Sequence, residues 1–442
     1  MSFLHQKSCE CVKSELDLFT LPPTQTSIES GKWVQYNPIS TLTDDSPIEF
    51  VVPGNGEEYT DLSQTMINVT ARVVTASGTN MTEDDDKKMV PINNFLHSLF
   101  SQVDLSLNQK LVTAQNNTYP FRSYIETVLN YGFDARKSHL SCGLWSADES
   151  AFMESIKDEE NDGAEERRSY VIRSQTCEMV GNVHLDICNQ NKYLLNGVEM
   201  RFKFIRSKDA FCLMTDGTQY KVKIDEAKLW LRRCKVSPSV LLAHNQILQT
   251  ATAKYPITRV DVRSFILPAG IRSKTLDNVF LGQVPKRVVT TMVTNAAFNG
   301  DYKKNPYNFQ HFKTNFFCIY VNGEQIPAKP LQPKYEGTGN KGKYIMAYHS
   351  LFSGTGIHFK DAGTLIGRKD YDDGYCMMAF DLTPDLSASD STHWNLVRNG
   401  TVRMEIGFDE ALTETVNFLV YAEFDNVIEV DRHRNVSVDF GG

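Results

Sequence analysis

The sequence predicts an all-β protein of two tandem β-sandwiches, with a few short helices in the loops between strands. Three observations support this fold class. The chain has 442 residues and a mass of 50.1 kDa, which is more than a single hydrophobic core usually serves. Short runs of alternating apolar and polar residues recur along it, as in strands that bury one face. A short signature also occurs twice, about half the chain apart.

Alternation with a period of two marks the individual strands. In the run 198–204, four apolar residues fall on one face and three charged residues on the other. The same pattern recurs at 67–73, 103–107, 220–224 and 402–406. Turn signals lie between such runs, at 53–56, 196–197, 216–217, 322–323, 373–374 and 399–400. Many short strands with sparse helical patterning favour sandwiches.

The repeated signature is an Asn-Phe-x-His motif followed by an apolar run that ends in Asn. The motif occupies residues 94–97 and 308–311, and the closing residues are Asn108 and Asn322. First to last Asn spans 14 residues in both copies (108 − 94 and 322 − 308), and the copies are offset by 214 (308 − 94). The histidines, His97 and His311, hold equivalent places in the repeat. We therefore expect them to share a structural role rather than a catalytic one.

Four further pairs of segments follow the same order in the two halves. They are 50–54 with 265–270, 183–187 with 378–382, the Asn-Gly turns 196–197 with 399–400, and the apolar strands 227–231 with 417–421. Five ordered pairs predict that one domain has been duplicated in tandem. The join is expected near residues 235–248, where Ser237-Pro238-Ser239 interrupts the strand pattern.

Few segments have helical patterning. The best candidate is 120–131, with Gly132 at its C-terminal cap, and its counterpart is 344–353, ending at Gly354. Residues 3–19 are compatible with a short amphipathic helix ahead of the first sheet. Two charged runs, 82–88 and 157–168, are too polar for a core and are expected at exposed loop tips. A metal site in these runs is the alternative, but their spacing lacks the EF-hand pattern.

Composition excludes several classes of function. The net charge of −8 provides no basic surplus for binding nucleic acid, so no sequence-specific nucleic acid binding is expected. No apolar stretch is long enough to span a membrane, and residues 1–7 lack the layout of a secretion signal. Nine scattered cysteines fit a reduced intracellular compartment. The glycosylation sequons at Asn68 and Asn399 are then coincidental.

No catalytic, cofactor-binding or metal-binding residue is predicted. Residues 337–344 match a phosphate-binding loop, but Tyr344 stands where Ser or Thr should hold Mg²⁺. Pro330 and Pro333 also exclude the buried strand that should precede such a loop. The pair Cys9-x-Cys11 has no second pair at zinc-finger spacing. The chain is therefore not expected to be an enzyme and requires no cofactor.

Several phrases in the chain resemble one protein family. They are 17–19, 25–28, 47–50, 59–62, 91–96, 119–126 and the Leu-Asn-Tyr-Gly run at 129–132. The sequence resembles the hexon-like major capsid protein of Polintons (Mavericks) and adintoviruses, which are virus-like DNA elements of animal genomes. The resemblance is densest over residues 15–135 and extends more loosely to the C-terminus.

The resemblance implies a double jelly-roll: two eight-stranded jelly-roll sandwiches in one chain, assembling as a homotrimer of pseudo-hexagonal outline. It implies an N-terminal arm at 1–30, an N-terminal jelly-roll at 31–236 and a C-terminal jelly-roll at 237–442. Its partners would be further copies of itself in the capsid lattice, with penton and minor capsid proteins. It would be found in the virion capsid, assembled inside the host cell in the nucleus. Two alternatives are a domesticated sandwich protein that binds a glycan or protein ligand, and a hydrolase on the same scaffold.

Overall fold

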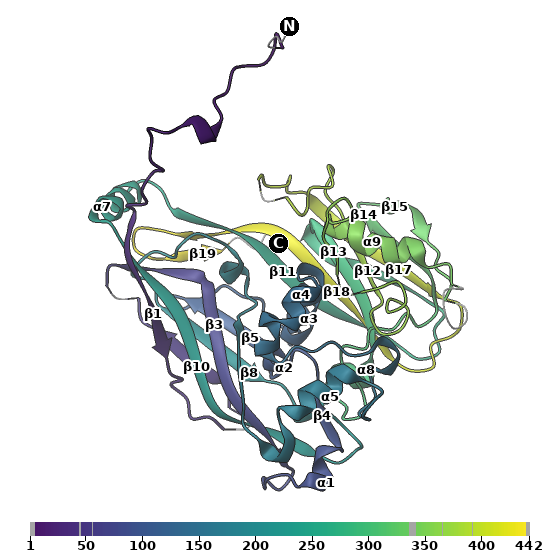
Figure 1. Cartoon of the computed structure of the whole chain (residues 1–442). Helices are drawn as coiled ribbons and strands as arrows, with labels where there is room; N and C mark the ends of the chain where they lie inside the picture. Colours follow the sequence, from purple (N-terminus) through teal and green to yellow (C-terminus); the bar gives the residue numbers. More distant parts are fainter. Residues whose placement is uncertain are drawn as a thin grey trace.

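The chain folds into two antiparallel β-sandwiches that follow one another in the sequence and lie side by side (Figure 1). The computed structural model describes residues 5–43, 46–54, 56–335, 342–364, 366–390 and 392–438. In Figure 1 the first sandwich is purple to teal and the second is green to yellow, and a long N-terminal segment leaves the body beside the first sandwich.

The first sandwich contains two four-stranded sheets. One has the order β1 (Ile28–Tyr36), β10 (Tyr220–Val236), β3 (Glu58–Thr75), β7 (Cys177–Asn182). The other has the order β2 (Ile48–Val52), β8 (Met200–Arg206), β5 (Phe100–Leu107), β6 (Lys110–Leu111). Fully buried side chains of both sheets, such as Leu229 and Phe202, share one hydrophobic core. Burying these apolar side chains stabilises the sandwich.

The second sandwich has the same construction. One sheet has the order β11 (Ala253–Leu267), β18 (Val416–Val430), β13 (Arg287–Thr294), β16 (Met377–Asp381), with β19 (Val436–Val438) added along β18. The other has the order β12 (Ser273–Gln283), β17 (Asn399–Phe408), β14 (Thr314–Val321), β15 (Glu324–Leu331). Pro327 and Pro330 lie in β15, which is an edge strand, where a missing N–H donor is tolerated.

Strand order identifies both sandwiches as jelly-rolls. The short strands β4 (Met89–Pro91) and β9 (Leu213–Thr215) pair only with each other and stand apart. When the other strands of each half are counted from one to eight, both halves show the order 1-8-3-6 in one sheet and 2-7-4-5 in the other. This arrangement is the eight-stranded double-sheet jelly-roll. The all-β fold class and the two tandem jelly-rolls are confirmed.

Every alternating run of the sequence lies within or overlaps a strand: 67–73 in β3, 103–107 in β5, 198–204 in β8, 220–224 in β10 and 402–406 in β17. Turn prediction is confirmed at Asn322-Gly323, a two-residue hairpin between β14 and β15 in which both residues have positive φ (53° and 87°). Asn108 and Gln109 form the matching hairpin between β5 and β6, with φ of 44° and 69°.

Three of the five repeat pairs fall on equivalent strands. The signature precedes β5 and β14, which are offset by the same 214 residues (314 − 100). Asn196-Gly197 is a turn just before β8, whereas Asn399-Gly400 begins β17 and pairs with β12, so the turn predicted there is wrong. The closing runs lie in β10 and β18.

The other two pairs are wrong in detail. Residues 50–54 end the second strand of their sandwich, whereas 265–270 end the first strand of theirs. Residues 183–187 follow β7, whereas 378–382 overlap β16, so that pair is out of register. An apolar run before a turn is a feature of most strand ends, so it does not identify a particular strand.

The two predicted helices are present and equivalent. They are α3 (Tyr119–Asn130) and α9 (Ile345–Thr355), and each lies between the fifth and sixth strands of its sandwich. The predicted caps are wrong. Tyr131 ends α3 in an extended conformation, and α9 continues through Gly354 to a left-handed cap at Gly356, where φ is 73°.

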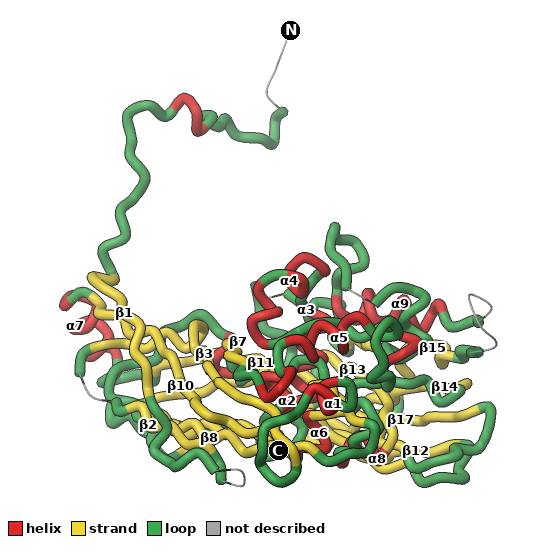
Figure 2. Tube along the Cα trace, turned by 60° about the horizontal axis from the view of Figure 1, so that its bottom comes forward, coloured by secondary structure: helices red, strands yellow, loops and turns green. Residues whose placement is uncertain are grey.

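The remaining α-helices are short, and several helices gather on one side of the strands (Figure 2). They are α1 (Glu83–Asp86), α2 (Phe95–Ser98), α4 (Phe133–Lys137), α5 (Asp162–Ser169), α6 (Asp209–Cys212), α7 (Pro238–Ile247) and α8 (Asn295–Asn299). Single 3₁₀ turns occur at Ser14–Leu16, His139–Gly143, Ser150–Phe152, Ile172–Ser174 and Asp186–Asn189.

The N-terminal segment is not the amphipathic helix expected at 3–19. Within its described part the chain forms only the 3₁₀ turn Ser14–Leu16, and residues 5–27 are exposed. A short helix without a packing surface is marginal in water. The join between the sandwiches is helical instead: Ser237-Pro238, expected to interrupt a strand, forms the N-cap and first position of α7.

Candidate assembly surfaces and the joint between the sandwiches

The closing asparagines of the repeat exchange the same two hydrogen bonds in both sandwiches, and Asn108 Nδ2 also donates to the Arg434 carbonyl at 2.7 Å. The Asn108 N–H donates to the Glu199 carbonyl at 2.9 Å, and the Glu199 N–H donates to Asn108 Oδ1 at 2.7 Å. In the second copy Asn322 and Thr401 exchange the same two bonds, both at 3.0 Å. Each asparagine thereby ties the hairpin after the fourth strand to the seventh strand. The equal spacing of the two copies of the signature reflects this shared structural role of the closing asparagine.

The histidines of the repeat share a position but not their contacts. His97 is buried, with Nδ1 3.0 Å from the Tyr119 hydroxyl and its ring centroid 4.7 Å from that of His184. Burial and the neighbouring His184 hold the pKa of His97 well below its ordinary value. His311 instead stacks on Tyr335 at 4.0 Å, and burial followed by the Lys313 charge lowers its pKa to about 4.

The first asparagines of the motif also differ in their partners. Asn94 Nδ2 donates to the Ser123 hydroxyl, within the first half of the chain. Asn308 Nδ2 donates to Glu154 at 3.2 Å, which joins the second half to the first. The two motifs therefore occupy equivalent positions in their sandwiches, but the residues that contact them differ.

A buried ionic cluster joins the two sandwiches. Arg122 on α3 lies 2.8 Å from Glu126 and 2.8 Å from Asp186, all three being nearly inaccessible to solvent. Asp186 accepts from the Val260 N–H on β11 at 3.2 Å, and Glu126 accepts from the Tyr421 hydroxyl on β18 at 3.4 Å. Both carboxylates belong to the first half of the chain and both donors to the second. The cluster therefore fixes the angle between the sandwiches.

The pKa values in this cluster follow from the competition between burial and charge. Burial raises the pKa of Glu126, but Arg122 and His184 outweigh it and bring the value to about 2. For Asp186, burial outweighs Arg122 and the pKa is raised. His184 Nδ1 lies 2.6 Å from the second oxygen of Glu126.

A second buried cluster corrects the expectation for residues 157–168. Arg167 on α5 is fully buried and lies 2.5 Å from Asp148 Oδ1. The other oxygen, Oδ2, accepts from Asn305 of the second half at 3.1 Å. Arg168 is also buried and pairs with Asp158. This charged run is therefore not a plain exposed tip, because it places two paired arginines in the interior, where an unpaired charge would be strongly destabilising.

The run 82–88 fits its prediction better. It forms α1, whose residues Glu83 and Asp84 are exposed. Asp85 is partly shielded: it closes a capping box with Thr82 and accepts from the Tyr220 hydroxyl at 2.9 Å. These hydrogen bonds, first among them those from Thr82, lower the pKa of Asp85.

The chemical motifs of the sequence do not assemble into a reactive site. Cys9 and Cys11 are exposed in the N-terminal segment, and residues 336–341 of the glycine-rich loop lie outside the described part of the chain. Within that part, no three His, Cys, Asp or Glu side chains gather as metal ligands would. Nor does any described helix have the length and apolar character required to cross a membrane.

One Ser-His-Asp set does occur, and its geometry opposes catalysis. Ser387 Oγ is 3.3 Å from His393 Nε2, but its single proton has two nearer acceptors, Asp385 Oδ1 at 2.7 Å and Asn395 Oδ1 at 2.9 Å. The other ring nitrogen is 3.9 Å from Asp390, beyond hydrogen-bond distance. Because the imidazole is exposed and does not receive the serine proton, the set lacks the activated nucleophile of a hydrolase.

Among the exposed large apolar side chains, two clusters each bring four together. The N-terminal segment exposes Leu16, Leu18, Phe19 and Leu21, by 68 to 95%. The loop before β17 exposes Leu386, Trp394, Leu396 and Val397, by 50 to 76%. Exposed apolar clusters of this kind are characteristic of surfaces that bind another protein.

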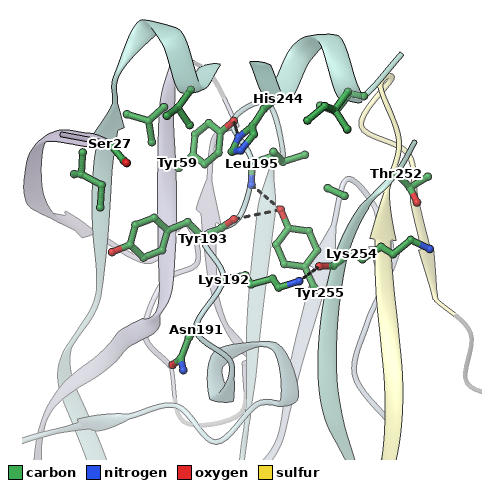
Figure 3. Close-up of a pocket in the computed structure, with 16 residues that line it drawn as sticks. Ser27, Tyr59, Asn191, Lys192, Tyr193, Leu195, His244, Thr252, Lys254 and Tyr255 are labelled. Atoms are coloured by element: carbon green, nitrogen blue, oxygen red, sulfur yellow. Dashed lines mark hydrogen bonds between the residues drawn. The ribbon is translucent and has the colours of Figure 1, made fainter. Parts of the chain in front are cut away.

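An apolar pocket of about 530 Å³ lies where the N-terminal segment, α7 and β11 meet (Figure 3). Tyr59, Val236, Ile247 and Tyr255 are among its lining residues. Sequence reasoning missed it because its walls come from segments far apart in the chain. No single motif carries such a site.

Comparison with known proteins gives the fold its context. No protein-family model matches the chain. The chain is 26% identical over 439 residues to an uncharacterized Caenorhabditis elegans protein, F54H12.2, covering 95% of this chain and 99% of that protein.

Three solved structures are similar over nearly the whole chain. A chain of the Sputnik virophage aligns with a TM-score of 0.63 at 11% identity, covering 100% of this chain and 95% of that one. A chain of the PBCV-1 virus capsid aligns at 0.55 and 10%, covering 96% and 100%. The Faustovirus major capsid protein aligns at 0.52 and 8%, covering 93% and 92%. The chain therefore has the double jelly-roll fold found in these viral structures.

Proposed function

We propose that this chain is the major capsid protein of a Polinton-type or adintovirus-type DNA element, and that it assembles as a pseudo-hexameric homotrimer. The observation that carries the proposal is the identical jelly-roll strand order in both halves of one chain. Three copies would present six similar sandwiches around a threefold axis, which tile a hexagonal lattice using closed symmetry. Similarity to a Faustovirus major capsid protein over 93% of the chain supports this reading.

The proposal assigns a task to each part of the chain. Residues 1–30 would form an arm, and 31–236 and 237–442 the two lattice-forming jelly-rolls. Strand β1 begins at Ile28, so the arm joins the first sheet directly. The partners would be further copies in the capsid lattice, together with penton and minor capsid proteins, with assembly in the host nucleus.

The surfaces suit assembly better than catalysis or sugar binding. An obligate trimer needs interfaces above about 2,000 Å² with apolar centres. The exposed loop containing Trp394 and Leu396 offers apolar side chains for such a centre. The 530 Å³ pocket is lined mainly by apolar groups, and the Tyr255 hydroxyl is bonded internally, whereas a sugar needs many free donors and acceptors. A capsid role is therefore preferred to a glycan-binding or hydrolase role.

Negative-stain electron microscopy of the purified full chain tests the proposal. We expect particles of triangular or hexagonal outline with six lobes. Two-lobed particles of single chains, at micromolar concentration, would contradict it. The variant Leu396→Asp is a useful companion, because a charge in an apolar interface should reduce the fraction of such particles.

A further inference from the structure

The apolar pocket is a groove prepared for an apolar side chain. Several of its polar atoms already have partners inside the protein (Figure 3). The Tyr255 hydroxyl donates to the Tyr193 carbonyl at 3.3 Å and accepts from the Leu195 N–H at 3.0 Å. The Tyr59 hydroxyl is 3.0 Å from His244 Nδ1. A ligand of this groove therefore gains affinity from apolar burial rather than from hydrogen bonds.

Helix α7, which forms one wall, is incompletely covered. None of its residues is buried, although its sequence contains Val240, Leu241 and Leu242 in succession. Ile247, which lines the groove, is 57% exposed. A ten-residue helix is marginal unless an apolar face packs against something. Helix α7 and the groove therefore both expose apolar surface that another segment could bury.

The N-terminal segment has the complementary property. Residues 5–27 are exposed, and Phe19 and Leu21 are exposed by 95% and 92%. Both views show the segment extending away from the body (Figures 1 and 2). Its length of 23 residues (27 − 5 + 1) gives a reach of about 75 Å when extended, enough to meet a neighbouring molecule.

We propose that the segment Leu16–Leu21 of one copy occupies the α7 groove of a second copy, with Phe19 as the anchor. Pro22 and Pro23 separate the anchor from the first strand and favour an extended chain directed outward, which opposes folding back into the groove of the same molecule.

Charge complements the apolar contact. Glu15 and Asp17 precede the anchor, and the rim of the groove carries Lys192 beside Lys254, whose ammonium is paired with Glu429 at 3.0 Å. Lys192 Nζ donates to the Lys254 carbonyl at 3.1 Å, which holds its ammonium at this rim. An acidic apolar segment entering a groove with a basic rim brings opposite charges together. This inference rests on the proposed function, because it requires copies that stand side by side.

Photocrosslinking in the full chain tests the exchange of segments between copies. Chain one carries benzoylphenylalanine in place of Phe19 together with Ile247→Glu, which places a charge in its own groove. Chain two carries Phe19→Ala and an intact groove. The two are co-expressed and irradiated. We expect a crosslinked product of the two different chains, joined at α7 or β11 of chain two. A crosslink only within chain one, or at another surface, would overturn the inference.

A matched variant separates the groove from its surroundings. Leu242 is 70% exposed on the same helix but does not line the groove. Placing Ile247→Glu in chain two should reduce the product at least tenfold, whereas Leu242→Glu in chain two should leave it unchanged. Equal loss with both substitutions would also overturn the inference. Light scattering on the same samples distinguishes failure of this inference from failure of the proposed function. Trimers that give no crosslink would refute only the exchange of segments. Monomers would refute the proposed function as well.

Discussion

Single residues explain why the duplication is visible in the sequence at all. Asn108 and Asn322 have positive φ and use both backbone and side chain to bond one residue of the seventh strand. Asn tolerates this conformation better than other non-glycine residues, and its side-chain oxygen accepts the neighbouring N–H. Two requirements at one position restrict the residue type strongly. At the strand positions between the repeated motifs, the side chain needs only to be apolar and buried. Many residue types meet this condition, so the two halves differ in sequence there.

Substituting either closing asparagine should destabilise its own sandwich. Asn108→Ala and Asn322→Ala each remove the acceptor for one backbone N–H and place alanine at positive φ. We expect each to lower the free energy of unfolding by about 1–2 kcal/mol, measured by urea denaturation. Asn322→Gly relieves the backbone conformation but not the lost acceptor, so it should cost less than Asn322→Ala. Equal stability of wild type and both alanine variants would show that the reciprocal bonds are unimportant.

Burial of His97 predicts an acid-sensitive fold. Its pKa lies well below the ordinary value of 6.5 in the folded chain, so only the unfolded chain takes up this proton as pH falls below 6.5. Stability should therefore fall with decreasing pH, by up to about 1.4 kcal/mol per pH unit from this residue. Denaturation between pH 7 and 5 measures the slope.

Two variants identify the source of that slope. His97→Gln should reduce the slope by the contribution of His97 and leave that of His311, whose pKa is lowered to about 4. Tyr119→Phe removes the hydroxyl beside His97 Nδ1 but leaves the imidazole buried, so the slope should persist. A slope that is identical in wild type and His97→Gln would exclude His97 as its cause.

At the scale of helices and strands, the sequence predicts where an individual element lies, because its pattern is contained in a short stretch of residues. Alternation located β3, β5, β8, β10 and β17, and helical spacing located α3 and α9. Strand order cannot be predicted in this way, because it depends on which distant strands exchange hydrogen bonds. The jelly-roll order followed from family resemblance and not from the patterns themselves.

The sequence was least informative where charged residues are buried. The run 157–168 looks solvated, and only the fold shows Asp148 opposite Arg167. The same applies to Arg122, whose partner Asp186 is 64 residues away (186 − 122). The apolar groove also escaped prediction, since Tyr59, Tyr193 and Tyr255 meet only after folding. Long-range pairing of this kind leaves no periodic trace in a single sequence.

Breaking the pair at α5 should be costly. Arg167→Met leaves the carboxylate of Asp148 buried without its cation, and we expect a loss of about 3–5 kcal/mol. The double variant Arg167→Met with Asp148→Asn removes both charges and keeps an acceptor oxygen for one of the two donors, Asn161 or Asn305, so it should recover part of the loss. Thermal unfolding measures both. If Arg167→Met were as stable as wild type, the buried ion pair would be unimportant, and residues 157–168 would behave as the exposed loop tip predicted from composition.

At the scale of the whole molecule, duplication and assembly belong together. The two halves share strand order, equivalent helices α3 and α9, and equivalent Asn turns. Polar contacts across the joint, from Asp186 and Asp148 to the second half, fix them in one arrangement. In the proposed trimer, a threefold axis would convert this rigid pair of similar sandwiches into a pseudo-hexagon. The exposed apolar side chains would then lie in the interfaces between copies.

The mass of the purified chain in solution tests the central claim most directly. Multi-angle light scattering at micromolar concentration should give about 150 kDa, three times the chain mass of 50.1 kDa. The peak should remain at that mass on tenfold dilution, as expected for an obligate interface. A monodisperse species of 50.1 kDa across the same range would contradict a trimeric capsid building block.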